Sequence, residues 1–102
     1  MDINGIRAII TGGVSGLGLA VARRFAEHDG RLALFDVNAD AAQAAVDELG
    51  ADRTRFFRTD VTDEQQVADN VAEALEFLGR IDALVNCAGV LGAGRVLGKH
   101  GP

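Results

Sequence analysis

Glycines are concentrated between residues 8 and 20, in the stretch AIITGGVSGLGLA. A glycine inside a strand or helix costs roughly 0.5–1 kcal/mol relative to alanine, so four of them so close together need a compensating role. A backbone without side chains lets an anion approach main-chain N–H groups, and a helix N-terminus carries a positive partial charge. The stretch therefore predicts a loop that binds a pyrophosphate group, shaped by Gly12, Gly16 and Gly18; a glycine-rich turn without a ligand is the alternative.

Two further residues of this stretch are candidates for contact with the same ligand. Ser15 could donate its hydroxyl to a phosphate, or could cap the helix that follows. The backbone around Leu17 is expected to face the pyrophosphate or a ribose.

A carboxylate ends the next strand-like run, RLALFD, at Asp36. Asp36 follows Gly18 by 18 residues, and at that place it can accept both hydroxyls of the adenosine ribose of NAD. The same charge would repel the 2′-phosphate of NADP by about 1–4 kcal/mol at a solvated separation of about 4 Å. The sequence thus predicts NAD as the cofactor, the alternative being that Asp36 merely ends a strand.

Polar residues also end two later strand-like runs, RFFRTD and IDALVN. Because Thr62 is expected to cap the following helix, Asp60 is expected to be free to accept the adenine amino group while the Val61 backbone contacts the ring; a solvated loop acid is the alternative. Asn86 is expected to tie the end of its strand to its neighbours through side-chain hydrogen bonds. The residues after it are expected to border the adenosine ribose: Cys87, Ala88 and Gly89.

Strand-like and helix-like runs alternate along the whole chain, which predicts that these residues are held by a parallel sheet. Short apolar runs indicate strands at 6–11, 31–36, 55–60 and 81–86, and the segments between them read as helices within 15–30, 38–50 and 62–79. The charged strand 55–60 suits a sheet edge. We therefore predict an α/β fold, a doubly wound Rossmann sheet of βαβαβαβ connectivity with strand order 3-2-1-4.

Periodicity and turn residues predict how each helix packs and where it begins and ends. Apolar stripes are expected along two helices, at Leu17, Val21 and Phe25 and at Val67, Val71, Leu75 and Leu78. Capping residues are expected at Asn38 for the second helix and at Thr62, with Gln65 in capping-box spacing, for the third. Glycines are expected to end the first two helices, at Gly30 and Gly50.

Composition argues against several classes of function. The 102 residues carry a net charge of −5, which disfavours nucleic acids and anionic membranes as partners. The single cysteine, Cys87, cannot form an intrachain disulfide, so a cytoplasmic location is expected. No apolar run approaches the roughly 18 residues of a membrane span, and the acidic start is unlike a signal peptide. No metal site is expected from two histidines and one cysteine far apart, and Cys87 has no evident base to make it a nucleophile.

The spacing Thr-Gly-x-x-x-Gly-x-Gly, from Thr11 to Gly18, resembles the short-chain dehydrogenase/reductase family. NCAG at 86–89 is similar to the N-N-A-G motif of that family, with Cys87 in the second asparagine position, and the Asp60–Val61 pair is a third match. The resemblance extends from Gly5 to about Gly92. Within the family, TGGVSGLGLA, FDVN, DVTDE and NCAGV look most like type 2 3-hydroxyacyl-CoA and hydroxysteroid dehydrogenases.

This resemblance implies an oxidoreductase that interconverts a secondary alcohol and a ketone, using a serine and a Tyr-x-x-x-Lys motif. The chain has no tyrosine, its one serine is Ser15 and its one lysine is Lys99. Residues 1–92 are therefore expected to be the NAD-binding N-terminal part of such an enzyme, followed by a glycine-rich tail at 93–102, with no catalytic residue of their own.

The intact parent is expected to act on a small molecule and to be a homo-oligomer. Two alternatives are a stand-alone nucleotide-binding module without catalysis and a truncated NADP-dependent 3-oxoacyl-carrier-protein reductase, against which Asp36 argues.

Overall fold

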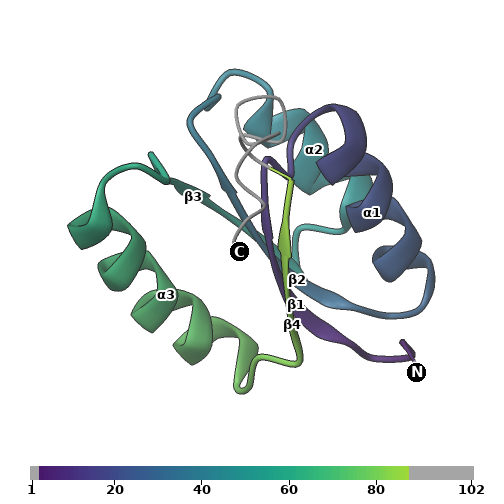
Figure 1. Ribbon diagram of the computed structural model, residues 1–102. Helices are drawn as coiled ribbons and strands as arrows, with labels where there is room; N and C mark the ends of the chain where they lie inside the picture. Colours follow the sequence, from purple (N-terminus) through teal and green to yellow (C-terminus); the bar gives the residue numbers. More distant parts are fainter. Residues whose placement is uncertain (1–2, 88–102) are drawn as a thin grey trace, which may run out of the picture.

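Four parallel strands form one sheet in the computed structural model, which describes residues 3–87 (Figure 1). The strands and helices alternate as β1 (Arg7–Thr11), α1 (Gly16–Glu27), β2 (Arg31–Asp36), α2 (Ala42–Leu49), β3 (Thr54–Arg58), α3 (Glu64–Leu78) and β4 (Ala83–Asn86). The strand order is β3-β2-β1-β4. The predicted fold class, connectivity and strand order are confirmed.

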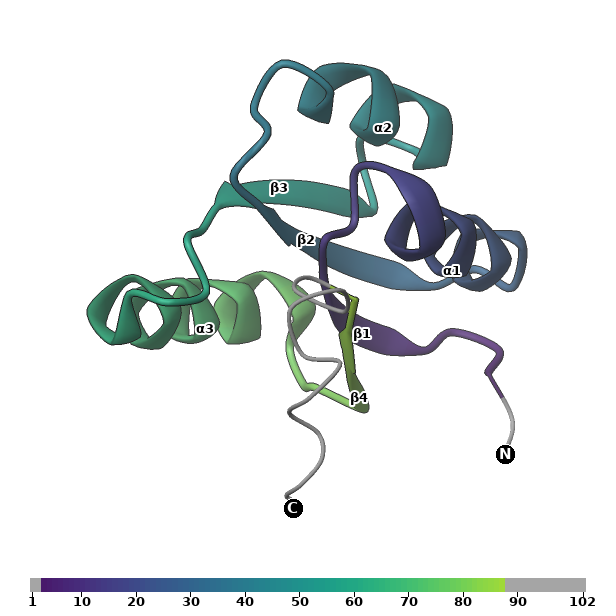
Figure 2. The same cartoon turned by 45° about the horizontal axis from the view of Figure 1, so that its top comes forward.

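Helices cover both faces of the sheet, α1 and α2 on one side and α3 on the other (Figure 2). Successive side chains of a strand point to opposite faces, so Ala8 and Ile10 pack in the α1/α2 layer while Ile9 packs in the α3 layer. β2 alternates in the same way, and its Phe35 meets Phe57 of β3 edge to face, with ring centroids 5.6 Å apart. Burial on both faces explains why β1 and β2 are continuous apolar runs.

The two outer strands of the described sheet differ in character. β3 carries exposed Arg55 and Arg58, and it lies at an edge as its charge predicts. β4 lies at the other edge, and its Leu84 side chain is 65% exposed on the side of the sheet that α3 covers.

The N-terminus of α3 is capped by a different residue from the one predicted. Asp63, not Thr62, is the N-cap, and its Oδ1 accepts hydrogen bonds from the backbone N–H groups of Gln65 and Gln66, both at 3.1 Å. The Gln66 side chain donates back to Asp63 Oδ2 at 3.1 Å. An ionised carboxylate is a stronger acceptor than a hydroxyl, and the Thr62 hydroxyl is already donated to Asp60.

The start of α2 also differs from the prediction. Asn38 does not cap the helix, because residues 39–41 form a turn first and α2 begins at Ala42. Asn38 instead closes that turn, its Oδ1 accepting the Ala41 N–H at 3.2 Å. Gly50 ends the helix as predicted, with a φ of 110°.

The end of α1 comes earlier than predicted, at Glu27. Gly30 closes the helix from outside by donating its N–H to Phe25 O at 2.9 Å, while Asp29 donates to Ala26 O at 3.1 Å. Asp29 adopts the left-handed conformation, with φ of 64°, that this Schellman closure needs.

The apolar stripes of α1 and α3 are each wrong at one residue. Leu17 is 63% exposed and Leu75 is 46% exposed. The buried residues of α1 are instead the small residues Gly18 and Ala22, because α1 approaches the glycine loop closely. In α3 the buried residues are Ala74 and Leu78.

Two strands stabilise the C-terminus of α3, whose own last turn has no basic residue. Arg7 at the start of β1 donates to Leu78 O, and Arg31 at the start of β2 donates to Phe77 O at 3.5 Å. The Arg31 guanidinium also lies 5.0 Å from the centroid of the Phe77 ring. Cations at this end of a helix are favourable, so the sheet supplies the charge that the helix lacks.

A buried hydroxyl on β3 allows a test of this core. Thr54 is 3% exposed and its Oγ1 has no hydrogen-bond partner among residues 3–87. Thr54→Val is expected to stabilise the chain by about 1 kcal/mol, since it removes an unsatisfied polar atom. Differential scanning calorimetry should show a rise of about 4–8 °C in Tm for a domain of this size.

The matched control is Thr59→Val, because Thr59 is equally buried but fully bonded. Its Oγ1 donates to Phe57 O at 2.8 Å and accepts from the Asn70 side chain at 2.8 Å. This variant is expected to lose about 1–3 kcal/mol of stability. Equal shifts for the two valine variants would contradict the assignment of Thr54 as unsatisfied.

Candidate nucleotide-binding site

The residues predicted to bind a cofactor come together at the carboxyl edge of the sheet. Because the strands are parallel, the ends of β1, β2 and β4 and the loops that follow them lie at one edge (Figure 1). In open α/β sheets this edge, near the point where the strand order reverses, is the usual place for a ligand. The order β3-β2-β1-β4 puts that reversal between β1 and β4.

The glycine loop turns directly from β1 into α1. Gly12 has φ of 68° and Gly16 has φ of 54°, conformations that other residues rarely adopt. A Cβ on Gly18 would lie 1.9 Å from the carbonyl oxygen of Gly12, so α1 and the loop are in backbone contact there. A Cβ on Gly13 would lie 2.9 Å from Leu34 Cδ2, which gives this glycine a packing role that the sequence did not indicate.

Ser15 occupies the N-cap position of α1 without capping it. Its backbone is extended, with φ of −156° and ψ of 166°, and its side chain makes no capping hydrogen bond. The residue is exposed, and the first turn of α1 contains no acidic side chain. The hydroxyl and the N-terminal N–H groups of α1 thus form a patch suited to an anion.

Asp36 is oriented toward this loop by two backbone donors. Its Oδ1 accepts the Asn38 N–H at 3.0 Å, and its Oδ2 lies 3.4 Å from the Val14 nitrogen, which donates to it. The link to Val14 joins the end of β2 to the glycine loop. It could not be predicted from the sequence, because the two residues lie 22 positions apart. The carboxylate is half-buried, beside the loop where a ribose next to the pyrophosphate would lie.

Asp60 is not without partners, contrary to the prediction. Its Oδ1 accepts from the Thr62 hydroxyl at 2.7 Å and from the Thr62 N–H at 2.9 Å. These bonds, with a smaller contribution from the charge of Arg58, lower the pKa of Asp60, so the carboxylate is ionised at neutral pH. One oxygen is thus engaged locally, and Val61 beside it is 42% exposed.

Asn86 forms the tie between strands that was predicted for it, and its partner is Thr11. The Thr11 hydroxyl donates to Asn86 Oδ1 at 2.8 Å and accepts from the Cys87 N–H at 3.0 Å. Thr11 therefore joins the ends of β1 and β4, a role that only its position as a polar residue ending an apolar strand could have suggested. Ala88 and Gly89 lie outside the described residues.

A hollow of about 280 Å³ opens at this edge between β4 and α3. Its apolar lining comes from Phe35, Val61, Leu84 and two valines of α3, Val67 and Val71. The polar residues that line it are Thr11 and Asn86. An apolar hollow with a few polar groups is typical of a site for a flat ring such as a purine.

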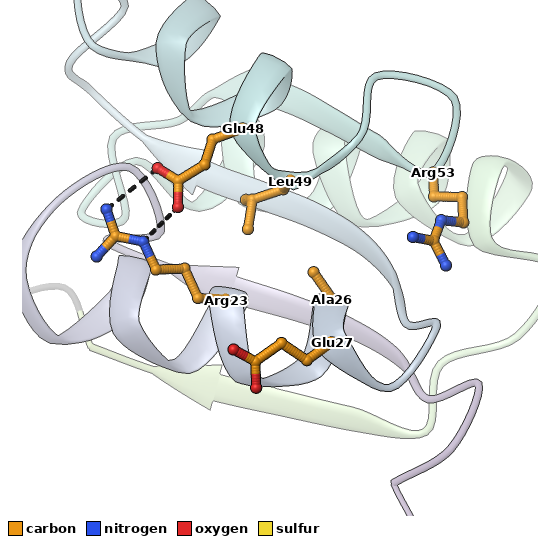
Figure 3. Close-up of a pocket in the computed structure, with 6 residues that line it drawn as sticks. All are labelled: Arg23, Ala26, Glu27, Glu48, Leu49 and Arg53. Atoms are coloured by element: carbon orange, nitrogen blue, oxygen red, sulfur yellow. Dashed lines mark hydrogen bonds and ion pairs between the residues drawn. The ribbon is translucent and has the colours of Figure 1, made fainter.

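A second hollow, of about 320 Å³, lies between α1 and α2 near their C-terminal ends (Figure 3). Three of its four charged side chains are paired within the protein. Arg23 forms a two-point ion pair with Glu48, which raises the pKa of Arg23 and lowers that of Glu48. Arg53, at the far side of the same hollow, pairs with Asp29 at 3.1 Å. None of the predicted site residues lines this hollow.

Two features are absent from residues 3–87. No group of three or more histidine, cysteine, aspartate or glutamate side chains in this part of the chain could hold a metal ion. Within the same residues, no helix has the length and hydropathy needed to cross a membrane.

The chain is similar in sequence to known proteins. A family model described as short chain dehydrogenase matches residues 7–99. Short-chain dehydrogenase reductase 3c of Arabidopsis thaliana is 39% identical over 91 residues, which are 89% of this chain and 35% of that protein. Momilactone A synthase of Oryza sativa subsp. japonica is 40% identical over 85 residues, 83% of this chain and 31% of that protein.

Two solved structures share the fold. A 3-ketoacyl-(acyl-carrier-protein) reductase from Brucella melitensis, complexed with NADH, aligns with a TM-score of 0.76 and 31% identity over 81% of this chain and 34% of its own. A short chain dehydrogenase from Bacillus anthracis aligns with a TM-score of 0.78 and 28% identity, over 84% and 36%. The chain thus spans about a third of the length of the relatives that it matches.

Proposed function

The chain belongs to the short-chain dehydrogenase family, and on that premise we propose that it binds NAD as the cofactor-binding part of an oxidoreductase. The glycine loop would hold the pyrophosphate through Ser15 and the N–H groups at the start of α1. Asp36 would accept the adenosine ribose hydroxyls, and the hollow at Val61 and Asn86 would take the adenine.

The observation that carries this proposal is the placement of the Asp36 carboxylate. It ends β2 and is hydrogen-bonded to the glycine loop at Val14 and to Asn38, so its charge is fixed beside the place where the pyrophosphate would dock. A carboxylate held there accepts hydroxyls well and repels a phosphate, which favours NAD over NADP.

For the whole protein we propose the interconversion of a secondary alcohol and a ketone, most specifically a 3-hydroxyacyl and 3-oxoacyl pair. The bound NAD would supply the chemistry by accepting a hydride from the alcohol carbon. The motifs TGGVSGLGLA and NCAGV and the ketoacyl reductase among the structural relatives support this substrate class. Asp36 argues against an NADP-dependent form of that reductase.

Calorimetric titration with NAD and NADP tests the cofactor assignment. NAD is expected to bind more tightly than NADP by roughly 5- to 800-fold. This ratio corresponds to a repulsion of about 1–4 kcal/mol between Asp36 and the 2′-phosphate of NADP. Asp36→Ala should narrow the preference by weakening NAD binding and relieving the repulsion of NADP.

Asp52→Ala is the control for the change in net charge, because Asp52 is exposed in the turn before β3, at the amino edge of the sheet. It should leave both affinities unchanged. Tighter binding of NADP by the unmodified chain would overturn the role given to Asp36.

A further inference from the structure

A cation lies beside Asp36 on the neighbouring strand. Arg58 ends β3 and is the register partner of Asp36. Paired residues of adjacent strands are about 4.8 Å apart and their side chains point to the same face of the sheet. Arg58 and Asp36 therefore share one face at the carboxyl edge.

Hydrogen bonds fix the backbone around Arg58, whereas its guanidinium forms no ion pair within residues 3–87. The Arg58 carbonyl accepts from the Asn70 side chain at 3.1 Å, and the next residue, Thr59, donates its N–H to the Asp36 carbonyl at 2.9 Å. The side chain is exposed, and within residues 3–87 no carboxylate oxygen lies within 4 Å of its guanidinium nitrogens. The positive charge of Arg58 contributes to lowering the pKa of Asp60, which lies at the same edge of the sheet.

The other exposed arginine of β3 is held differently. Arg55 lies on the opposite face of the strand, with its guanidinium 4.9 Å from the centroid of the Phe57 ring and 3.8 Å from the Glu73 carboxylate. Both arginines protect a sheet edge. Arg58 alone of the two lies on the face of the sheet that Asp36 shares, and it forms no ion pair within residues 3–87.

We infer that Arg58 is a second determinant of cofactor choice, which binds a phosphate on the 2′ position of the adenosine ribose once the Asp36 charge is removed. A guanidinium suits a phosphate because it donates two parallel hydrogen bonds. With both residues present, Arg58 offsets part of the repulsion from Asp36. This inference rests on the proposed function, because it places the adenosine ribose at Asp36.

Titration with 5′-AMP and adenosine 2′,5′-bisphosphate isolates the 2′-phosphate without any turnover. Asp36→Asn should raise the affinity for the bisphosphate relative to AMP. Adding Arg58→Gln to that variant should lower bisphosphate affinity by about tenfold or more, the strength of one charge-assisted contact, while AMP affinity changes by less than about twofold. Arg58→Lys in the same background should restore part of the loss.

Arg55→Gln in the Asp36→Asn background is the matched control, with the same change of charge on the same strand. It should leave the ratio of the two affinities unchanged, and thermal melts should show that all the variants fold. If Arg58→Gln and Arg55→Gln have equal effects while AMP still binds, the inference is wrong and the proposed function stands. If the unmodified chain binds neither AMP nor NAD, the proposed function fails and the inference fails with it.

Discussion

Replacing Gly18 with alanine is expected to abolish nucleotide binding and to lower the free energy of unfolding by roughly 3 kcal/mol, the upper range for overpacking. The added Cβ would lie 1.9 Å from the Gly12 carbonyl oxygen and 2.6 Å from the Gly12 carbonyl carbon. Both atoms belong to the backbone of the loop, so the collision cannot be relieved by rotating a side chain. Either α1 moves away from the loop or the loop loses its shape, and the anion site is lost in both cases.

Gly16→Ala separates this collision from backbone strain. Nothing lies within 4 Å of a Cβ at Gly16, but the residue has a φ of 54°. Its cost should be about 1–2 kcal/mol, that of a left-handed residue with a side chain. Urea denaturation and NAD titration of both variants make the comparison. A Gly18→Ala protein as stable as the unmodified chain would show that α1 does not approach the loop this closely.

The 102-residue chain is expected to bind NAD and yet to oxidise no secondary alcohol above background. Hydride transfer from an alcohol also requires a group that removes the hydroxyl proton, and positioned acid–base groups contribute about 10²- to 10⁴-fold in rate. The chain has no tyrosine, and its single lysine is Lys99. Asp36 and Asp60 lie at the proposed adenosine half of the site, so neither would reach the reacting carbon.

NADH formation with 3-hydroxyacyl-CoA and with simple secondary alcohols is the measurement. Calorimetry on the same sample must show NAD binding, so that a lack of turnover is not a lack of cofactor. A longer polypeptide that contains this chain together with the serine and the Tyr-x-x-x-Lys motif of the family should turn over the same substrates. Clear turnover by the 102 residues alone would mean that another group performs the proton transfer.

The order of the elements could be predicted because it depends on patterns that are local in the sequence. Apolar runs such as RLALFD are buried on both faces, and alternation of strands with helices leaves few ways to wind a parallel sheet. The details at helix ends were less predictable. Thr62 and Asp63 are adjacent and both are good N-caps, so the choice depends on Asp60, which takes the hydroxyl of Thr62.

The remaining errors in the predicted fold arose from packing distances, which the sequence does not reveal. A period of four along α1 marks Leu17 as a core residue, but contact between Gly18 and the loop turns the helix so that Leu17 is exposed. The arginines that cap α3 could not be found from the sequence either, because Arg7 lies 71 residues from the carbonyl that it contacts.

The residues of the candidate site could be predicted, but not the hydrogen bonds that hold them. The sequence indicated the residues that end each strand, and the parallel sheet brings Asp36, Asp60 and Asn86 to one edge. It did not indicate how Asp36 and Asn86 are held, because Val14 and Thr11 lie 22 and 75 positions away from them in the sequence. Val14 orients Asp36 and Thr11 bonds Asn86 only after the chain has folded.

The central position of β1 has a consequence for synthesis of the protein. β1 pairs with β2 and with β4, and the hydrogen bond from Thr11 to Asn86 spans 75 residues. Ribosomes that add about 5–20 residues per second need roughly 4–15 s to make that length. During this time one edge of an apolar strand, Ala8 to Ile10, has no partner from its own chain. A nascent chain is therefore most exposed to chaperones and to misassociation before β4 leaves the ribosome, and slow translation of residues 60–80 would prolong that interval.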